Sequence, residues 1–445
     1  MLRSMLAVAV LLLVNPRALA VESLADKALS LVSPDFASRH AAVRFFVDRG
    51  NEDAVPALIA ASRFADDDRE LQSGLEALAG AKEADWFHWM LWQQAHPEVM
   101  PFAGYDEFQA SLYRKIDPHF DAFLGAGVPH SIRLEEITWG GVLKDGIPAL
   151  TNPRLIASIR ASYLRPDDLV FGVSINGDSR AYPLRVMDWH EMFNDVIGGV
   201  PVSLAYCTLC SSGILFETTV PGREKPFVFG SSGFLYRSNK LMYDTETNSL
   251  WNQFTGRPVV GKLTGSGIVL KTRPVVITKW ADWMAANPAT RVLDSNTGFE
   301  RDYSPGSAYG AYFSSGELMF PALVDESKLK AKDYVFALRS SGADKAWPLK
   351  RFAGGAVIND KAGVLDLVLI GDQKNREVRA YRSDGRTFTK SSGPESAIAP
   401  DGKTWRVTED ALIGPAGESF ARLPGHIAYW FAWSGYFGAS GELAE

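Results

Sequence analysis

The chain has 445 residues, of which 46% are apolar, and its 46 basic and 52 acidic side chains give a formal net charge of −6. A mildly acidic chain without a basic stripe is a poor candidate for binding nucleic acid or anionic lipid through bulk electrostatics. The length indicates two or three domains with sizeable cores, and the presence of only two cysteines excludes a disulfide-dense scaffold.

The first twenty residues have the three parts of a secretory signal peptide. Arg3 provides a basic start, residues 5–14 are an unbroken apolar run, and residues 18–20 (Ala-Leu-Ala) have the small-x-small pattern of a cleavage site. The apolar run is too short to span a bilayer, and the later run at 427–433 is shorter still. We therefore expect residues 1–20 to be removed and the mature protein to be soluble, without an integral membrane segment. Its expected location is the periplasm or the extracellular space.

Residues 21–130 are predicted to form a small helical module. Apolar residues recur three and four positions apart in segments rich in alanine and leucine, such as 53–64 and 70–97. The pattern resembles short helix pairs stacked in a helical-repeat module. The tryptophans of the second segment are interpreted as core residues.

From about residue 131 the pattern changes to short strands that are separated by turn residues. Residues 170–184 contain two alternating apolar runs around Asn176-Gly177, which is a strong hairpin signal because both residues tolerate a positive φ. The predicted fold class is therefore α+β, with a helical module followed by a mostly β region.

This β-rich region is predicted to be internally duplicated. The segment 170–184 aligns with 335–349 at a constant offset of 165, with six of fifteen positions identical. We therefore expect a first β-rich module at 131–325 and a second, degenerate module at 326–445. The two are expected to pack together, so that each covers the open face of the other.

The two predicted modules differ at residues that could bind a metal or ionise. At the offset of 165, a glycine and an alanine replace His190 and Glu191, and an aspartate and an asparagine replace Cys207 and Cys210. The shared residues are mainly apolar residues, glycine and proline, which serve folding. The sequence therefore predicts a functional site in the first module only.

Cys207 and Cys210 have a C-x-x-C spacing that suits a metal site, a redox disulfide or a simple bend. A redox pair of the thioredoxin type lies where a strand runs into a helix, because the helix N-terminus stabilises the thiolate. Here Ser-Ser-Gly and then β-forming residues follow Cys210. This strand–turn–strand context favours a metal site, in which the turn directs both sulfurs at one ion.

Two thiolates and an imidazole suit a zinc or copper ion. His190, on a predicted helical turn, is the expected third ligand. Glu191 is either an alternative ligand or a residue that contacts the ligands without binding the metal itself, and Asp188 and Asp195 are further alternatives. His426 is a weaker candidate, since a histidine beside an aromatic run is more often a packed core residue.

Two other functions stay open on the sequence alone, and so does the question of whether the protein is an enzyme. In the first, the protein is a thiol–disulfide oxidoreductase in which Cys207 attacks and His190 or Glu191 adjusts its pKa. In the second, it is a non-catalytic module that binds a glycan or a peptide. Its ligand would lie against residues 229–256, which are rich in glycine, serine, asparagine and aromatic residues.

Over roughly residues 131–440 the sequence resembles the uncharacterised family known as domain of unknown function 3179. The similar motifs are Trp189-His190-Glu191, Asn194-Asp195, Tyr206-Cys207-x-x-Cys210, Phe229-Gly230-x-x-Gly233, Met242-Tyr243-Asp244, Ser249-Leu250-Trp251 and Leu423-Pro424-Gly425-His426. Family members commonly have a proline after the first cysteine and a glycine after the second, where this chain has Thr208 and Ser211. The resemblance implies module boundaries and no particular reaction.

Overall fold

The computed structural model describes residues 22–65, 67–340, 343–391, 393 and 395–444. The predicted signal peptide lies outside these residues, so cleavage and export stay predictions. Within the described part of the chain, no helix is both long enough and apolar enough to cross a membrane.

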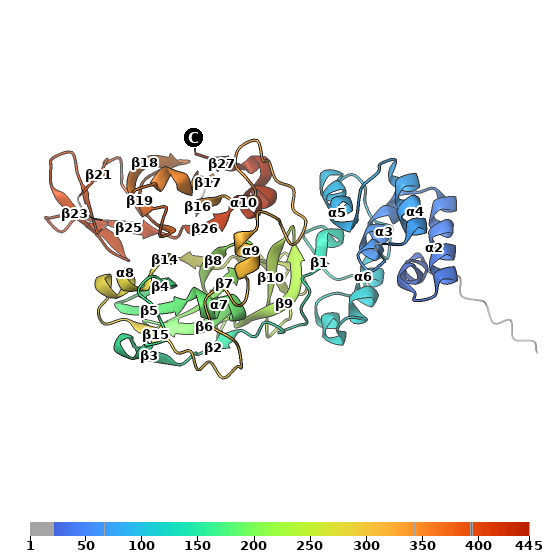
Figure 1. Ribbon diagram of the computed structural model, residues 1–445, viewed down its shortest axis with the longest axis horizontal. Helices are drawn as coiled ribbons and strands as arrows, with labels where there is room; N and C mark the ends of the chain where they lie inside the picture. The colour runs from blue at the N-terminus through green and yellow to red at the C-terminus, as the bar shows by residue number, and fades with distance from the viewer. Residues whose placement is uncertain (1–21, 66, 341–342, 392, 394, 445) are drawn as a thin grey trace, which may run out of the picture.

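The N-terminal part is helical, as predicted, and lies at one end of the molecule (Figure 1). Its helices are α1 (Leu24–Leu29), α2 (Phe36–Arg49), α3 (Val55–Ser62), α4 (Arg69–Ala79), α5 (Trp86–Ala95) and α6 (Tyr105–Arg114). Asp35 and Asp68 cap α2 and α4 by accepting backbone N–H groups, and glycines in the left-handed region end both helices. Trp89 is fully buried, as expected for a core residue.

Short 3-10 turns occur in both parts of the chain. They are η1 (Ser30–Val32), η2 (Glu52–Ala54), η3 (Pro118–Ala122), η4 (Leu134–Glu136), η5 (Ser158–Arg160), η6 (Leu349–Phe352) and η7 (Gly438–Ser440). Of these, η6 borders a cavity in the C-terminal part of the chain.

The rest of the chain is mostly β, which confirms the predicted fold class. One sheet packs on the helical part and has the order β1 (Ile137–Trp139), β9 (Phe229–Tyr236), β10 (Asn239–Asp244), β11 (Leu250–Asn252), β12 (Arg257–Val260). The next has the order β13 (Lys271–Arg273), β8 (Ser212–Glu217), β7 (Val200–Cys207), β6 (Met192–Ile197), β2 (Leu150–Thr151). A third has the order β14 (Val276–Lys279), β4 (Leu169–Ile175), β5 (Asp178–Pro183), β15 (Arg291–Leu293), β3 (Leu155–Ala157).

The C-terminal residues add two more sheets. One has the order β26 (His426–Tyr429), β16 (Tyr334–Ser340), β17 (Ala343–Pro348), β27 (Gly441–Leu443). The other has the order β18 (Ala356–Ala362), β19 (Leu365–Asp372), β20 (Glu377–Arg382), β25 (Ser419–Leu423), β24 (Ala411–Ile413), β23 (Thr404–Val407), β22 (Ser396–Ile398), β21 (Thr389–Lys390). The β region also carries α7 (Leu184–His190), α8 (Trp280–Ala286), α9 (Gly310–Ser314) and α10 (Trp430–Phe437).

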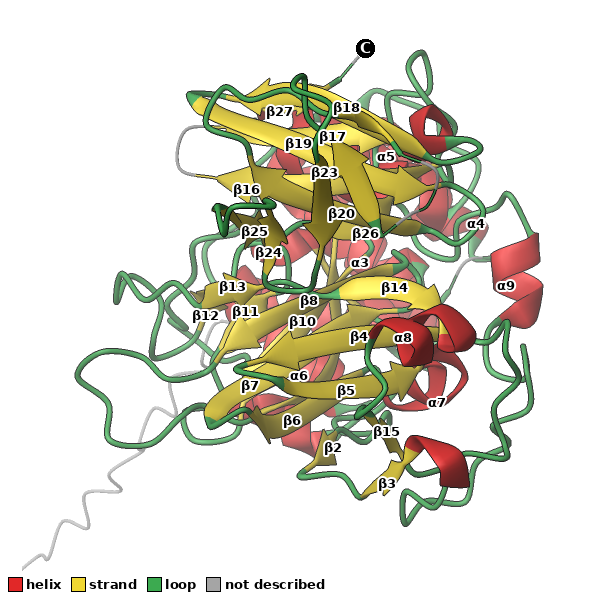
Figure 2. Ribbon diagram, turned by 90° about the vertical axis from the view of Figure 1, so that its left-hand side faces the viewer, coloured by secondary structure: helices red, strands yellow, loops and turns green. Residues whose placement is uncertain are grey.

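The C-terminal sheets lie as one layer over the sheets that contain β4–β8 (Figures 1 and 2). One apolar core joins the layers, because Phe171, Tyr182 and Phe193 of the first belong to the same buried cluster as Phe336 and Trp347 of the second. Cys207 and Cys210 belong to a second buried cluster, which also contains Val335 of β16 and Ala428 of β26.

The same order of elements recurs along the chain. The strands β4, β5, β7 and β8 begin 165 residues before β16, β17, β19 and β20. The Tyr182 hydroxyl donates to Asp195 at 2.7 Å, and the Trp347 indole donates to Asp360 at 2.7 Å at the corresponding positions. Duplication of one ancestral unit stays a prediction; these contacts describe a geometric correspondence between the two halves.

Candidate functional site

The two cysteines lie at the tip of the β7–β8 hairpin, where Cys207 pairs with Ser212. The backbone N–H of Cys210 donates to the Cys207 carbonyl at 3.2 Å, which closes the turn. Ser211 has φ +50°, in the left-handed region that favours glycine. A glycine at this position would suit the backbone equally well. The strand–turn–strand context predicted from sequence is present.

Both thiols are buried and unbonded to one another, with 2% of Cys207 and 0% of Cys210 exposed. Sγ of Cys210 lies 3.3 Å from the Ser238 carbonyl oxygen and 3.3 Å from Oδ1 of Asn239. Burial raises the pKa of Cys210 well above its usual value, and a hydrogen bond between the two thiols adds to the increase. The two cysteines are thus free and buried together at the tip of one hairpin.

A buried ion pair lies beside this dithiol. Glu191 directly follows α7 with φ +55°, and its carboxylate forms an ion pair with Lys240 of β10. The carboxylate also accepts a hydrogen bond from the Thr208 hydroxyl at 2.8 Å, and the Lys240 ammonium donates to Oγ of Ser231 at 3.2 Å. The charge of Glu191 contributes to the raised pKa of Cys210. Glu191 therefore lies beside the hairpin turn and is already paired with a lysine.

Tyrosines and a second carboxyl group complete the surroundings of the thiols. The Tyr309 side chain hydrogen-bonds to Thr208, and the Tyr312 hydroxyl of α9 donates to the Leu209 carbonyl at 2.8 Å. Asp188 of α7 is buried and accepts a hydrogen bond from the Tyr206 hydroxyl at 3.2 Å. Burial raises the pKa of Asp188 to about 7, against the opposing effects of this bond and of the Arg376 charge.

The His190 ring contacts residues other than the two cysteines, although His190 directly precedes Glu191. Its Nδ1 lies 2.9 Å from the Pro148 carbonyl oxygen, and its Nε2 lies 2.6 Å from the Tyr303 hydroxyl. Both ring nitrogens are therefore engaged, and burial lowers the pKa of the imidazole. This geometry corrects the expectation that His190 joins the two sulfurs. The helix ends at His190 and the left-handed backbone of Glu191 follows, so the two neighbours reach different partners.

The other proposed ligands also lie apart from the sulfurs. His426 begins β26 with its ring 5.7 Å from Phe254, and its buried Nε2 has no partner among the described residues. The backbone N–H of Tyr429 donates to the Cys210 carbonyl at 2.8 Å. His426 is three positions earlier, about 10 Å away along an extended strand. Asp195 pairs with Arg180 at 2.7 Å.

No group of three or more His, Cys, Asp or Glu side chains that could hold a metal ion occurs in the part of the chain that the structure describes. The predicted set of two cysteines plus a histidine is therefore not assembled in this geometry. What the structure does bring together is the dithiol alone, with the Glu191–Lys240 pair beside it.

The segment 229–256, predicted as a lining for a glycan or peptide, forms β9, β10 and β11 and is almost entirely buried. Phe229 and Trp251 pack against each other in the core with ring centroids 5.3 Å apart. The aromatic side chains of this segment therefore do not provide a binding surface.

Sequence reasoning missed Lys240, Thr208 and Tyr309. A lysine within the apolar strand sequence "NKLMYD" is the one signal that could have indicated Lys240, since an unpaired buried lysine is rare. Tyr309 lies in a segment without regular periodicity, about a hundred positions from the cysteines, and no local pattern marks it.

No curated protein and no solved structure is significantly similar to this chain. Residues 144–440, which include the hairpin tip, α7 and the C-terminal layer, match the sequence profile of a family described as "Protein of unknown function". Because the match covers well over half of the chain, the protein belongs to this family, DUF3179.

Proposed function

We propose that Cys207 and Cys210 are a redox-active dithiol that is converted reversibly to an intramolecular disulfide. The observation that carries the proposal is the position of two free, buried cysteines in one hairpin turn, where the Cys210 N–H donates to the Cys207 carbonyl at 3.2 Å. A zinc site needs three or four protein ligands, and the described residues supply no third ligand to this pair. Export, which the N-terminal pattern predicts, would supply the oxidising surroundings in which such a pair cycles.

The proposed reaction exchanges the dithiol with a small disulfide, RSSR. Cys207, the slightly exposed thiol, attacks as its thiolate and releases one RSH; Cys210 then attacks the mixed disulfide and releases the second. One Cys–Cys bond forms, one RS–SR bond breaks, and the two thiol protons leave with the two RSH products. In this proposal the Glu191 carboxylate, which accepts the Thr208 hydroxyl at the hairpin tip, relays these protons.

Burial sets the expected rate of this reaction. Burial raises the pKa of Cys210, so its attack on the mixed disulfide is slow until the ion pair or a neighbouring hydroxyl assists it. Tyr309 and Tyr312 are hydrogen-bonded to the hairpin tip and limit access to it. We therefore propose a small molecule, rather than a folded protein, as the oxidant or reductant.

Equilibration of the mature protein with oxidised and reduced dithiothreitol, followed by acid quenching, alkylation and mass spectrometry, tests this proposal. We expect a transition between a doubly alkylated form and a form that has lost two hydrogen atoms and takes up no alkylating agent. Cys207→Ser and Cys210→Ser each remove the internal disulfide. If the wild-type protein stays doubly alkylated at every ratio of the two reagents, the redox proposal is wrong.

A copper(I) ion is a second candidate for the same two sulfurs, because soft thiolates select copper(I) and two of them are already adjacent. The observation that favours it lies beside Cys210: Nδ2 of Asn239 is a buried N–H donor without a partner among the residues described, and such a donor would stabilise a neighbouring thiolate. Titration of reduced protein with copper(I) in the presence of a competing chelator is expected to give one bound ion per chain and none in the double serine variant. His190→Ala should leave this stoichiometry unchanged, and a loss of copper in that variant would restore the three-ligand prediction.

A further inference from the structure

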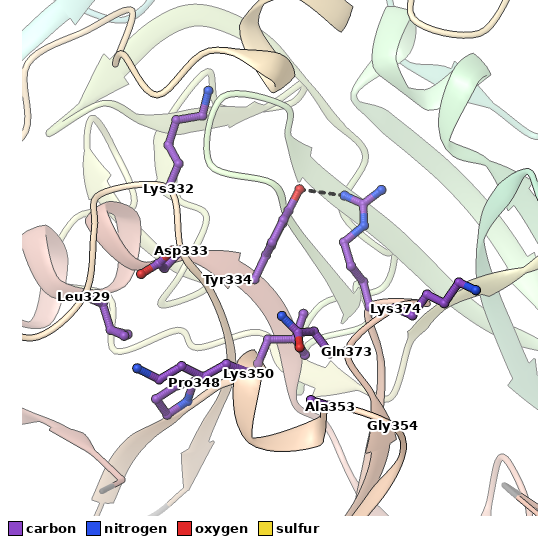
Figure 3. Close-up of a pocket in the computed structure, with 12 residues that line it drawn as sticks. Leu329, Lys332, Asp333, Tyr334, Pro348, Lys350, Ala353, Gly354, Gln373 and Lys374 are labelled. Atoms are coloured by element: carbon purple, nitrogen blue, oxygen red, sulfur yellow. Dashed lines mark hydrogen bonds between the residues drawn. The ribbon is translucent and has the colours of Figure 1, made fainter.

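A cavity of about 580 Å³ lies in the C-terminal layer (Figure 3). It is bordered by β16, η6 and the turn between β19 and β20. Its volume falls in the range of small-molecule sites. Four cationic side chains line it, Lys332, Lys350, Lys374 and Arg376, against one carboxylate, Asp333. This excess of positive charge stands out on a chain whose overall net charge is −6.

Arg376 is the most strongly positioned of these cations. It lies in the β19–β20 turn with φ +53°, and one guanidinium N–H donates to the Tyr334 hydroxyl at 2.8 Å, as Figure 3 shows. Among the described residues this guanidinium forms no ion pair with a carboxylate, although its charge acts on the buried Asp188. A half-buried arginine that is held by a tyrosine and left without an anion is suited to bind one from solution.

Lys332 is a second half-buried cation without a carboxylate partner in the described structure. Its ammonium donates to the backbone carbonyls of Tyr312 and Ser315, the latter at 2.7 Å, and lies 3.6 Å from the centroid of the Tyr312 ring. Burial lowers the pKa of Lys332. Lys350 and Lys374 also line the cavity, and both are exposed to solvent.

We propose that this cavity is a binding site for a small, multiply charged anion of metabolite size, held by Arg376 together with Lys350 and Lys374. Phosphate and carboxylate groups share the chemistry that such a set of donors recognises, and a ligand with two or more negative charges would match the four cations and one carboxylate. The site is separate from the dithiol, and its existence does not depend on the redox proposal.

The cavity nevertheless lies close to the hairpin tip. The Tyr334 hydroxyl, which Arg376 contacts, lies 3.2 Å from the Tyr429 hydroxyl, and the Tyr429 backbone N–H donates to the Cys210 carbonyl. A pair of tyrosines therefore stands between the cavity and the cysteines. In this arrangement the side chains of Tyr334 and Tyr429 would separate a bound anion from the two cysteines.

Isothermal titration calorimetry on the mature full chain tests the proposal, with pyrophosphate and citrate as separate probes and chloride as the singly charged reference. We expect saturable one-to-one binding of at least one probe, with an affinity that falls as salt is added. Tighter binding of pyrophosphate would indicate a phosphate site, and tighter binding of citrate would indicate a carboxylate site. Absence of saturable heat for both probes at millimolar concentration overturns the proposal.

Variants locate the site. Lys374→Gln and Lys350→Gln change exposed side chains, which should leave the fold intact, and together they should weaken binding at least tenfold; Arg376→Gln should weaken it further. Lys262→Gln removes one exposed positive charge outside the cavity and is the matched control, for which no change is expected. Equal binding by the Lys350/Lys374 double variant and the control contradicts the proposal. The double serine variant of Cys207 and Cys210 should bind the probe normally. Failure of the redox proposal can therefore be distinguished from failure of the anion-site proposal.

Discussion

Replacing Lys240 with methionine is expected to lower the free energy of unfolding by about 3–5 kcal/mol. The substitution shortens the side chain by one atom and leaves the Glu191 carboxylate buried without its cation, and removing one partner of a buried pair has an effect of this size. Lys240 is only 3% exposed and Glu191 7%, so water cannot readily replace the lost charge. Denaturation in urea, with unfolding followed by tryptophan fluorescence, measures the change.

The double variant Lys240→Met/Glu191→Gln separates loss of charge pairing from loss of packing. Because the glutamine is neutral and can still accept the Thr208 hydroxyl, we expect the double variant to recover most of the stability that the single variant loses. Lys403→Met, in an exposed pair with Asp401 at 3.2 Å, is the matched control and should change stability by less than about 1 kcal/mol. A Lys240→Met protein as stable as this control would show that the buried pair contributes nothing.

Asp188 is expected to make the protein more stable as the pH falls from 8 to 5, relative to an Asp188→Asn variant. Burial raises the pKa of this carboxyl from 3.8 to about 7, so the folded state holds the proton more tightly than the unfolded state does. A group of this kind adds stability as the pH falls through the folded-state pKa, and adds none above it. The relative gain for the wild type between pH 8 and pH 5 is about 2–3 kcal/mol.

The charged and titratable groups that face Asp188 are Tyr206, Arg376, Glu191 and Tyr309. Urea denaturation of the wild type and of Asp188→Asn at several pH values isolates the contribution of the carboxyl, because other groups titrate equally in both proteins. Asp401→Asn, an exposed site on the C-terminal layer, is the control and should track the wild type across this range. Parallel curves for Asp188→Asn and the wild type would contradict a raised pKa for Asp188.

Local features of the fold were predictable because they depend on residues close together in sequence. The helical N-terminal part follows from apolar spacing and capping aspartates, and the β4–β5 hairpin follows from Asn176-Gly177, both of which have positive φ. The closeness of the two thiols is also local, since the hairpin turn brings residues three positions apart together.

The partners of the site residues depend on long-range packing, and there the sequence was a poorer guide. His190 meets Pro148 and Tyr303, which are 42 and 113 positions away, because α7 ends there and packs against those segments. Glu191 meets Lys240, 49 positions away, because β10 lies next to the hairpin tip. Periodicity and spacing contain no information on which of two neighbouring side chains will face a given strand.

By itself, the sequence determined that a helical part precedes a mostly β part and that the two cysteines share one turn, since backbone preferences and turn chemistry act over a few residues. The tertiary structure alone decided that the dithiol lies beside a buried Glu191–Lys240 pair rather than an imidazole, and that four cations surround a cavity in the C-terminal layer. Those arrangements arise only when two layers of sheet close over one core, because burial and charge pairing are properties of the packed chain.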